Sequence, residues 1–378
     1  MTAKSNNKKI VIILGAGSTI DNADVQNEYE KPPSNKNFFK KTYEFLKSAK
    51  IDTLKRHEML YEFEYVRAYF EIWHGRDIFS DKCNFLEIVM AQIFTDVKTN
   101  SPPERPAFQV FLAFLRLFYD ILGETTNNIK TDSDKPLYQI LANFIRNGVS
   151  PENLTIISFN YDIYVERILA TLARSFHDPN YQVFLLQNCY ELNLSIFDFT
   201  MASRPIIGWF PVLLDAKKGG VRVLKLHGSL NWYSPSPTKN IEFDSMFKRD
   251  RVLKISREMG INSNQLRYRT REGHLCYTLP VIVPPIRNKS EIYHSKILKL
   301  WDISKKSLFE ADEILIYGYS CPDLDIDVKE LLRESVHRNR KIQNISVIDP
   351  TPAIHEHYAV LFNPKGIRSY FNSSSFFN

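Results

Sequence analysis

The sequence predicts an α/β protein with a Rossmann-like parallel sheet, helices on both faces of the sheet and a large helical insertion. Short runs rich in Val, Ile and Leu recur along the chain at residues 10–14, 154–159, 221–226, 314–317 and 345–348. Each run ends at a polar or glycine-bearing turn. Continuous apolar runs of this length are typical of strands buried on both faces, as in a parallel sheet covered by helices.

The segment between the first two runs is much longer than a simple crossover, so we expect a helical insertion there. Its expected helices span residues 37–48, 61–69, 85–97, 107–122 and 136–146. Side chains in the fourth helix fall on one apolar stripe, namely Phe108, Phe111, Leu112, Leu115 and Phe118. We therefore expect one α/β domain over residues 1–378, with the helical insertion at 30–150 and a second, irregular insertion at 233–290.

Composition excludes several classes of protein. The chain has 49 Lys and Arg against 43 Asp and Glu, a formal net charge of +6. This weak, dispersed charge does not identify a nucleic-acid binder, so direct binding of nucleic acid is not expected. No apolar stretch approaches the length of a bilayer-spanning helix, and the N-terminal residues lack a signal-peptide pattern. A cytoplasmic protein without membrane contact is expected.

The cysteines do not suggest a metal site. Cys83, Cys189, Cys276 and Cys321 lie far apart and form no C-x-x-C pair. A zinc ribbon needs closely spaced thiolates, and disulfides are rare in cytosolic proteins. Buried or idle thiols, without zinc, are expected.

The first run ends in Gly15-Ala16-Gly17-Ser18-Thr19. Glycines at a strand-to-helix turn allow backbone N–H groups to approach a pyrophosphate, and the helix N-terminus favours its charge. The third glycine of the dinucleotide fingerprint is missing, because Ile20 stands in its place. Both a nucleotide-binding loop and an ordinary turn fit this segment.

Polar residues also follow the second and third runs. Asn160 and Asp162 come directly after the second run, at the strand end where open α/β sheets bind ligands. Alternatively, one of them caps the helix that begins near Tyr164. His227 follows the third run and precedes Gly228. Its imidazole can serve as a base or bond a sugar hydroxyl.

The last two runs end similarly. The fourth is followed by Gly318, Ser320 and alternating aspartates over residues 323–327. A calcium loop is excluded because the required glycine is absent, whereas acidic residues suit the first turn of a helix. Asp349 follows the fifth run, where a carboxylate could bond a ribose hydroxyl.

In this order, the segments resemble the motifs of the sirtuin-like family. Residues 15–18 match its glycine motif, and 158–162 resemble the motif whose asparagine and acidic residue lie near the nicotinamide ribose. Residues 227–228 match its histidine motif, and 318–320 are similar to its glycine-serine motif. Residues 348–349 fall where a late strand reaches the adenosine side. The resemblance covers the strand framework and leaves the insertions unmatched.

Protein-deacylating sirtuins carry a four-cysteine zinc module and an arginine after the glycine motif. This chain has no such module, and residues 20–28 contain no arginine. The sequence resembles instead the bacterial sirtuin-like NAD hydrolases of anti-phage defence, which share the Asn-Tyr-Asp and His-Gly-Ser forms and the Pro-Pro step at 284–285. That resemblance implies NAD depletion in abortive infection and, as for some members of that group, a HerA-type hexameric ATPase as partner. We also expect a homo-oligomer.

The resemblance implies NAD as substrate, with no zinc. Asn160 would position the ribose or the attacking water, His227 would polarise a ribose hydroxyl or accept a proton, and Asp162 would support the charge or orient its neighbours. The expected NAD-binding residues are Gly15, Ala16, Gly17, Ser18, Thr19, Gly318, Ser320 and Asp349. Two alternatives stay open: an NAD-dependent protein deacylase or ADP-ribosyltransferase, and a non-catalytic nucleotide-binding subunit of a larger complex.

Overall fold

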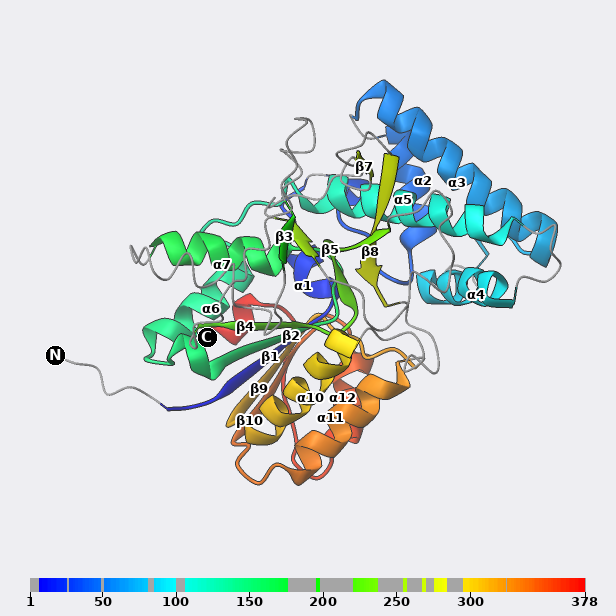
Figure 1. Cartoon of the computed structure of the whole chain (residues 1–378). Coiled ribbons are helices and arrows are strands. Elements are labelled where there is room, and N and C mark those ends of the chain that lie inside the picture. The colour runs from blue at the N-terminus through cyan, green and yellow to red at the C-terminus, as the bar shows by residue number, and fades with distance from the viewer. Residues whose placement is uncertain are drawn as a thin grey trace.

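The computed structural model shows a central sheet with helices above and below it (Figure 1). It describes residues 7–25, 27–48, 51–80, 85–99, 106–175, 195–197, 220–236, 254–256, 267–269, 275–283, 295–323 and 325–377. The Pro-Pro step at 284–285, Cys83 and Cys189 lie outside the described residues.

The central sheet has six parallel strands in the order β11-β10-β9-β1-β2-β4. Their bounds are β1 Ile10–Leu14, β2 Leu154–Ser158, β4 Arg222–Lys225, β9 Glu313–Tyr317, β10 Asn344–Ile348 and β11 Arg368–Tyr370. Strand β1 lies at the centre, and Leu14 is in register with Ser158 of β2 and Tyr317 of β9. Five strands match the apolar runs of the sequence, and β11 was not predicted.

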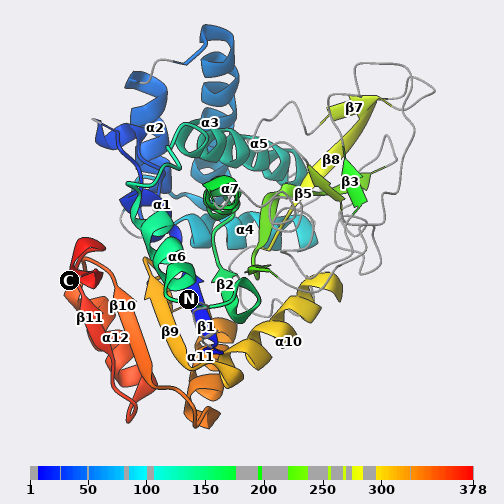
Figure 2. The same ribbon diagram turned by 90° about the vertical axis from the view of Figure 1, so that its left-hand side faces the viewer.

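Helices cover both faces of this sheet. The chain moves from β1 to β2 and β4 on one side, then returns to β9 and continues to β10 and β11 on the other. Because such crossovers are right-handed, α6 (Pro136–Arg146) and α7 (Tyr164–Ser175) lie on one face. The opposite face carries α10 (Ser295–Glu310), α11 (Ile326–Arg338) and α12 (Pro352–Phe362), as Figures 1 and 2 show. This arrangement confirms the predicted fold class.

The strand order reverses between β1 and β9. In open α/β sheets, ligands bind outside the carboxyl ends of the strands at such a switch point. The short helix α1 (Ala16–Asp21) begins there, immediately after β1. The segments that follow β1, β2, β4 and β9 therefore meet at one edge of the sheet.

A helical layer, α2 to α5, lies above this edge (Figure 1). Its helices are α2 Phe38–Ser48, α3 Thr53–His74, α4 Leu86–Thr99 and α5 Ala107–Thr126. They share an aromatic core separate from that of the sheet, in which the Phe38 and Phe118 rings lie 5.6 Å apart. Of the predicted apolar stripe, Phe108 and Leu112 are only half-buried.

Helix α3 is much longer than the predicted 61–69 because both of its ends are capped. The Asp52 carboxylate accepts hydrogen bonds from the Leu54 and Lys55 N–H groups, and Gly75 ends the helix in the left-handed conformation. Helix α6 belongs to the predicted insertion segment but packs into the core of the sheet.

A second sheet has the strand order β3-β6-β5-β8-β7. Its strands are β3 Ser195–Phe197, β5 Gly228–Ser236, β6 Lys254–Ser256, β7 Arg267–Arg269 and β8 Leu275–Ile282. Three of them begin within 233–290, the stretch expected to be irregular. The bounds of the predicted domain and of its two insertions stay predictions.

Three short 3-10 helices complete the described chain: η1 Glu28–Glu30, η2 Pro151–Asn153 and η6 Ser374–Phe376. At the edge of the central sheet, β11 pairs with β10, and the Asp349 N–H donates to the Tyr370 carbonyl. None of the described helices has both the length and the apolar character needed to cross a membrane.

Candidate functional site at the carboxyl ends of the sheet

The loops after β1 and β9 are packed directly against each other. The Gly17 N–H donates to the Gly318 carbonyl at 2.9 Å, and the Gly15 N–H donates to the Tyr317 carbonyl at 3.2 Å. Gly318 has a φ of +62°, and a Cβ there would lie 2.2 Å from the Ser18 nitrogen. Glycines are therefore required here for close packing of the two loops, because any side chain would force the loops apart.

This packing bears on the choice between a nucleotide loop and an ordinary turn. The N–H groups of Gly15 and Gly17 are bonded to the β9 segment, and the Ser18 N–H donates to the Gly15 carbonyl. Ser18 and Thr19 are buried, whereas Ala16 is exposed. Of the five predicted phosphate-loop residues, the exposed Ala16 and the half-buried Gly17 thus offer accessible surface. Ser18 and Thr19 are buried and stabilise the conformation of the loop.

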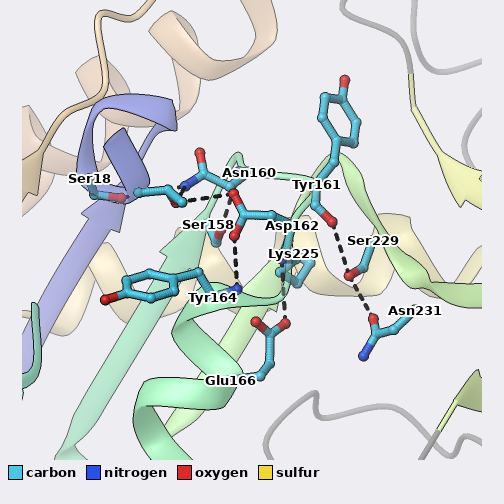
Figure 3. A network of polar contacts seen from close by, with 11 residues as sticks. Ser18, Ser158, Asn160, Tyr161, Asp162, Tyr164, Glu166, Lys225, Ser229 and Asn231 are labelled. Atoms are coloured by element: carbon cyan, nitrogen blue, oxygen red, sulfur yellow. Dashed lines mark hydrogen bonds and ion pairs between the residues drawn. The ribbon is translucent and has the colours of Figure 1, made fainter. Parts of the chain in front are cut away.

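Asn160 ties the segment after β2 to the loop after β1. Its Nδ2 lies 3.0 Å from the Gly15 carbonyl, 3.2 Å from the Thr19 hydroxyl and 3.4 Å from the Ser18 hydroxyl. The amide oxygen of Asn160 points away from these groups (Figure 3) and accepts no hydrogen bond from the described residues. The side chain is therefore held in one orientation that leaves an acceptor for another molecule.

Asp162 uses both carboxylate oxygens within the protein. Its Oδ1 accepts from the Tyr164 N–H at 2.9 Å, and its Oδ2 accepts from the Thr19 hydroxyl at 3.0 Å. The capping alternative is thus observed for Asp162 at the start of α7. Since Thr19 in turn contacts Asn160, the Asp162 carboxylate also orients the asparagine network.

A buried ion pair lies beneath this network. Lys225, the last residue of β4, has its Nζ 3.4 Å from a carboxylate oxygen of Glu166 in α7, and both side chains are buried. The same Nζ donates to the Asp162 carbonyl (Figure 3). This pair joins β4 to the segment after β2 and was not identified from the sequence. A lysine inside an apolar strand run is the signal that could have indicated it, because a buried charge needs a partner.

His227 lies beside the residues that flank Asn160. Its ring centroid is 5.1 Å from that of Phe159 and 6.1 Å from that of Tyr161. Its carbonyl accepts from the Val283 N–H at 2.8 Å, and Gly228 turns the chain with a φ of +79°. Asn160 and His227 therefore lie at the same edge of the sheet, on the segments after β2 and β4.

Asp325, which precedes α11, is a further member of the site. Its Oδ1 lies 3.6 Å from the His227 Nε2, and its Oδ2 accepts from the Tyr319 hydroxyl at 2.6 Å. Burial and the charge of Asp325 raise the pKa of Tyr319 well above its usual value, so this phenol stays protonated and donates. Sequence analysis placed Asp325 only in a helical first turn, and it makes no side-chain cap bond there. Only the tertiary structure shows that it faces the histidine.

The remaining predicted residues lie at the next strand end. The Gly318 N–H donates to the Ile348 carbonyl at 3.0 Å, which joins the segments after β9 and β10. The Asp349 Oδ1 accepts from the Thr351 N–H at the start of α12. Ser320 is half-buried in the loop after β9. The structure thus brings residues 15–19, 160, 162, 227 and 318 together, with Asp349 one strand further along the edge.

Together these residues provide a fixed amide acceptor, an imidazole backed by a carboxylate, and an exposed turn at a switch point. Such groups can orient water and accept a proton without a metal. Within the part of the chain that the structure describes, no group of three or more His, Cys, Asp or Glu side chains could hold a metal ion.

The comparisons with known proteins give likenesses of structure alone. No protein-family model matches the sequence, and a search of curated proteins finds no match. The chain is similar to a mutant Sir2 homologue in complex with ADP-ribose, with 14% identity, a TM-score of 0.36, and coverage of 71% of this chain and 73% of that one. It is also similar to a Sir2 homologue in complex with NAD, with 13% identity, a TM-score of 0.35 and 71% coverage of each chain. At these scores the likenesses do not establish a family.

Proposed function

We propose that the chain is an NAD hydrolase that cleaves the bond between nicotinamide and ribose. The observation that carries the proposal is the orientation of Asn160, whose Nδ2 is held by Gly15, Ser18 and Thr19 while its Oδ1 has no donor among the described residues. This acceptor lies at the sheet edge shared with His227, at the switch point where such folds bind nucleotides.

The proposed chemistry is the addition of water at the ribose C1′. The C1′–N bond breaks, its electron pair leaves with nicotinamide, and water adds at C1′ to give ADP-ribose and a proton. Nicotinamide leaves as a neutral molecule from a cationic pyridinium, so no general acid is needed. The Asn160 Oδ1 orients the water or a ribose hydroxyl, and the His227 imidazole accepts the proton.

Asp325 and Asp162 act as positioning residues in this proposal. A carboxylate 3.6 Å from the His227 Nε2 stabilises the imidazolium that forms when the proton is taken up. Asp162 acts on Asn160 through the Thr19 hydroxyl, in keeping with the expectation that it orients its neighbours.

The exposed turn at Ala16 and Gly17, together with Gly318 and Ser320, is proposed to receive the pyrophosphate. Asp349 is proposed to bond the adenine ribose through its second carboxylate oxygen, since the first accepts from the Thr351 N–H. NAD depletion during anti-phage defence and a HerA-type ATPase as partner are further proposals that rest on the sequence resemblance. A cytoplasmic location is also proposed, from the sequence patterns described above.

The test is the release of nicotinamide from NAD by the purified chain, alone and with a HerA-type ATPase. Removing a positioned acid–base group costs about 10²–10⁴-fold in rate. Asn160→Ala and His227→Ala should each lower turnover by about that factor. Asn147→Ala, which removes an exposed amide outside the site, is the matched control and should leave turnover unchanged. Thermal unfolding verifies that each variant is folded.

Full turnover in folded Asn160→Ala and His227→Ala would overturn the assignment. Asp325→Asn distinguishes positioning from packing: loss of the carboxylate should move the acid limb of the pH–rate profile to lower pH, because the imidazolium loses its partner. A purely structural role would lower stability and leave that limb in place.

Transfer of acyl or ADP-ribosyl groups to a peptide would favour the deacylase or transferase alternative. Binding of NAD without turnover under all of these conditions would favour the non-catalytic subunit.

A further inference from the structure

Helix α3 carries an apolar stripe on the surface of the helical layer. Ile72, Tyr61 and Leu54 are 74%, 70% and 69% exposed, and among the large apolar side chains of the described residues only Val360 on α12, at 79%, is more exposed. Among the described residues, three of the four most exposed large apolar side chains thus lie on one helix. Scattered apolar residues on a surface are ordinary, whereas a group on one helix needs an explanation.

The stripe is continuous along the helix. Its members lie four and three residues apart in alternation, the spacing that keeps side chains on one face of a helix that packs against another. They are Leu54, Glu58, Tyr61, Tyr65, Ala68 and Ile72. The Tyr61 and Tyr65 rings stack with centroids 6.2 Å apart and an angle of 4° between their planes.

This face is not the one that α3 uses within its own layer. The core side of α3 is formed by Met59, Glu62, Phe63, Val66, Tyr69 and Phe70, which are buried against the rest of the helical layer. Figures 1 and 2 show α3 at the outer edge of the molecule, with α5 on its inner side. Leu54, Tyr61 and Ile72 are therefore accessible along the helix, whereas Tyr65 between them is half-buried and also packs against the helical-layer core.

The stripe is symmetric about Phe63. Leu54 and Ile72 are equally far from Phe63 along the helix, and the same holds for Tyr61 and Tyr65. A two-fold axis at the middle of α3 would therefore place Leu54 against Ile72 of a second copy and Tyr61 against its Tyr65. An isologous interface requires this kind of self-complementary surface.

Charges beside the stripe fit the same arrangement. In an antiparallel pair, His57 at one end of α3 lies near Glu71 of the second copy, and the two-fold axis repeats the contact. Glu64 lies near its own equivalent, but Arg67 of the same helix is 3.3 Å from the Glu64 carboxylate and compensates its charge. Glu58 lies opposite Ala68, which leaves room for the carboxylate to reach solvent.

We propose that α3 is a homodimer interface, in which the Leu54–Ile72 stripes of two copies pack antiparallel. A fully exposed aromatic side chain can bury about 150–250 Å², and the half-buried Tyr65 adds less than Tyr61. Two tyrosines and two aliphatic side chains from each copy therefore bury on the order of 1,000 Å² in total, near the lower end of the range for specific interfaces. The proposal is independent of NAD hydrolysis.

Light scattering after size-exclusion chromatography of the full chain tests the interface. The wild-type chain should have twice the mass of one chain, which is 44.1 kDa. Tyr61→Lys combined with Tyr65→Lys, and Tyr61→Glu combined with Tyr65→Glu, should each give the mass of one chain, because like charges would be buried against each other. An equimolar mixture of the two variants should restore the dimer. Val360→Glu, which changes an even more exposed apolar side chain on α12, should remain dimeric.

A wild-type chain with the mass of a single copy at all soluble concentrations overturns the proposal, and so does dimer formation that both charge variants retain. Disulfide cross-linking tests the antiparallel orientation. The Leu54→Cys and Ile72→Cys variants should cross-link efficiently with each other when they are mixed, and each should cross-link poorly when it is alone. Cross-linking of the wild-type chain through its native cysteines gives the background. Cross-linking of each variant with itself, and not with the other, contradicts the antiparallel arrangement.

Discussion

The sheet-end site and the helical layer bury charge in different ways. In the site, both partners of the Lys225–Glu166 pair are buried, and the lysine also donates to the Asp162 carbonyl. In the helical layer, the buried Glu62 is paired with Arg116, which is partly exposed. Burial raises the pKa of Glu62 to about 7, although the Arg116 partner opposes this shift. In the site, the two charges are therefore buried together as a pair. In the helical layer, the buried acid Glu62 can instead be neutralised by binding a proton.

The two regions also use glycine differently. Gly318 in the site and Gly75 at the end of α3 have nearly the same φ, +62° and +57°. A Cβ on Gly318 would meet backbone atoms of Gly17 and Ser18, whereas a Cβ on Gly75 would meet nothing within 4 Å. Gly318 is therefore required both for its backbone conformation and for the lack of space for a side chain, whereas Gly75 is required for its backbone conformation alone.

The largest expected effect follows from this pair of glycines. Gly75→Ala should lower the free energy of unfolding by about 1–2 kcal/mol, the cost of a left-handed alanine. Gly318→Ala adds a backbone clash that neither loop can relieve, so its cost should exceed about 4 kcal/mol. Urea unfolding of both variants measures the difference. Equal costs would show that the loops after β1 and β9 are free to separate.

A second comparison sets the two ion pairs against each other. Lys225→Met leaves the Glu166 charge buried without its lysine and removes a donor from the Asp162 carbonyl, which should cost about 3–5 kcal/mol. Arg116→Met should cost only about 1 kcal/mol at neutral pH, because Glu62 can become protonated. Denaturant unfolding at pH 7 measures both. A reversed order would mean that the site tolerates an unpaired buried acid better than the helical layer does.

The third and smallest effect is the pH dependence that Glu62 of the helical layer adds to the stability. With a pKa raised from 4.5 to about 7 in the folded chain, Glu62 binds more protons when folded than when unfolded over that interval. Its contribution to stability is therefore complete below about pH 4.5 and is lost as the pH rises through about 7, by up to about 3 kcal/mol.

Glu62→Gln should flatten the dependence of unfolding free energy on pH between 4.5 and 7. Glu64→Gln, on the exposed side of the same helix, serves as the control and should keep the wild-type slope. If the wild-type and Glu62→Gln slopes coincide, the acid titrates with its ordinary pKa.

Local sequence patterns determined the strands and the position of the candidate site. The apolar runs specify buried parallel strands because such strands face helices on both sides, and the residues just after parallel strands must meet at one edge. Asn160 and His227 could therefore be chosen without coordinates. Helix α3 was underestimated because its N-terminal half is polar on several sides, and its length depends on the caps at Asp52 and Gly75.

Only the tertiary structure decided which side chain faces which. The tertiary structure places the Asp325 carboxylate beside His227 and pairs Lys225 with Glu166. It also brings Gly318 into close contact with Ser18. It also showed that the α3 stripe points outward, whereas its spacing alone equally suits a buried face. The physical reason is that the sequence encodes the periodicity of each element, while contacts between distant elements depend on how those elements pack in three dimensions.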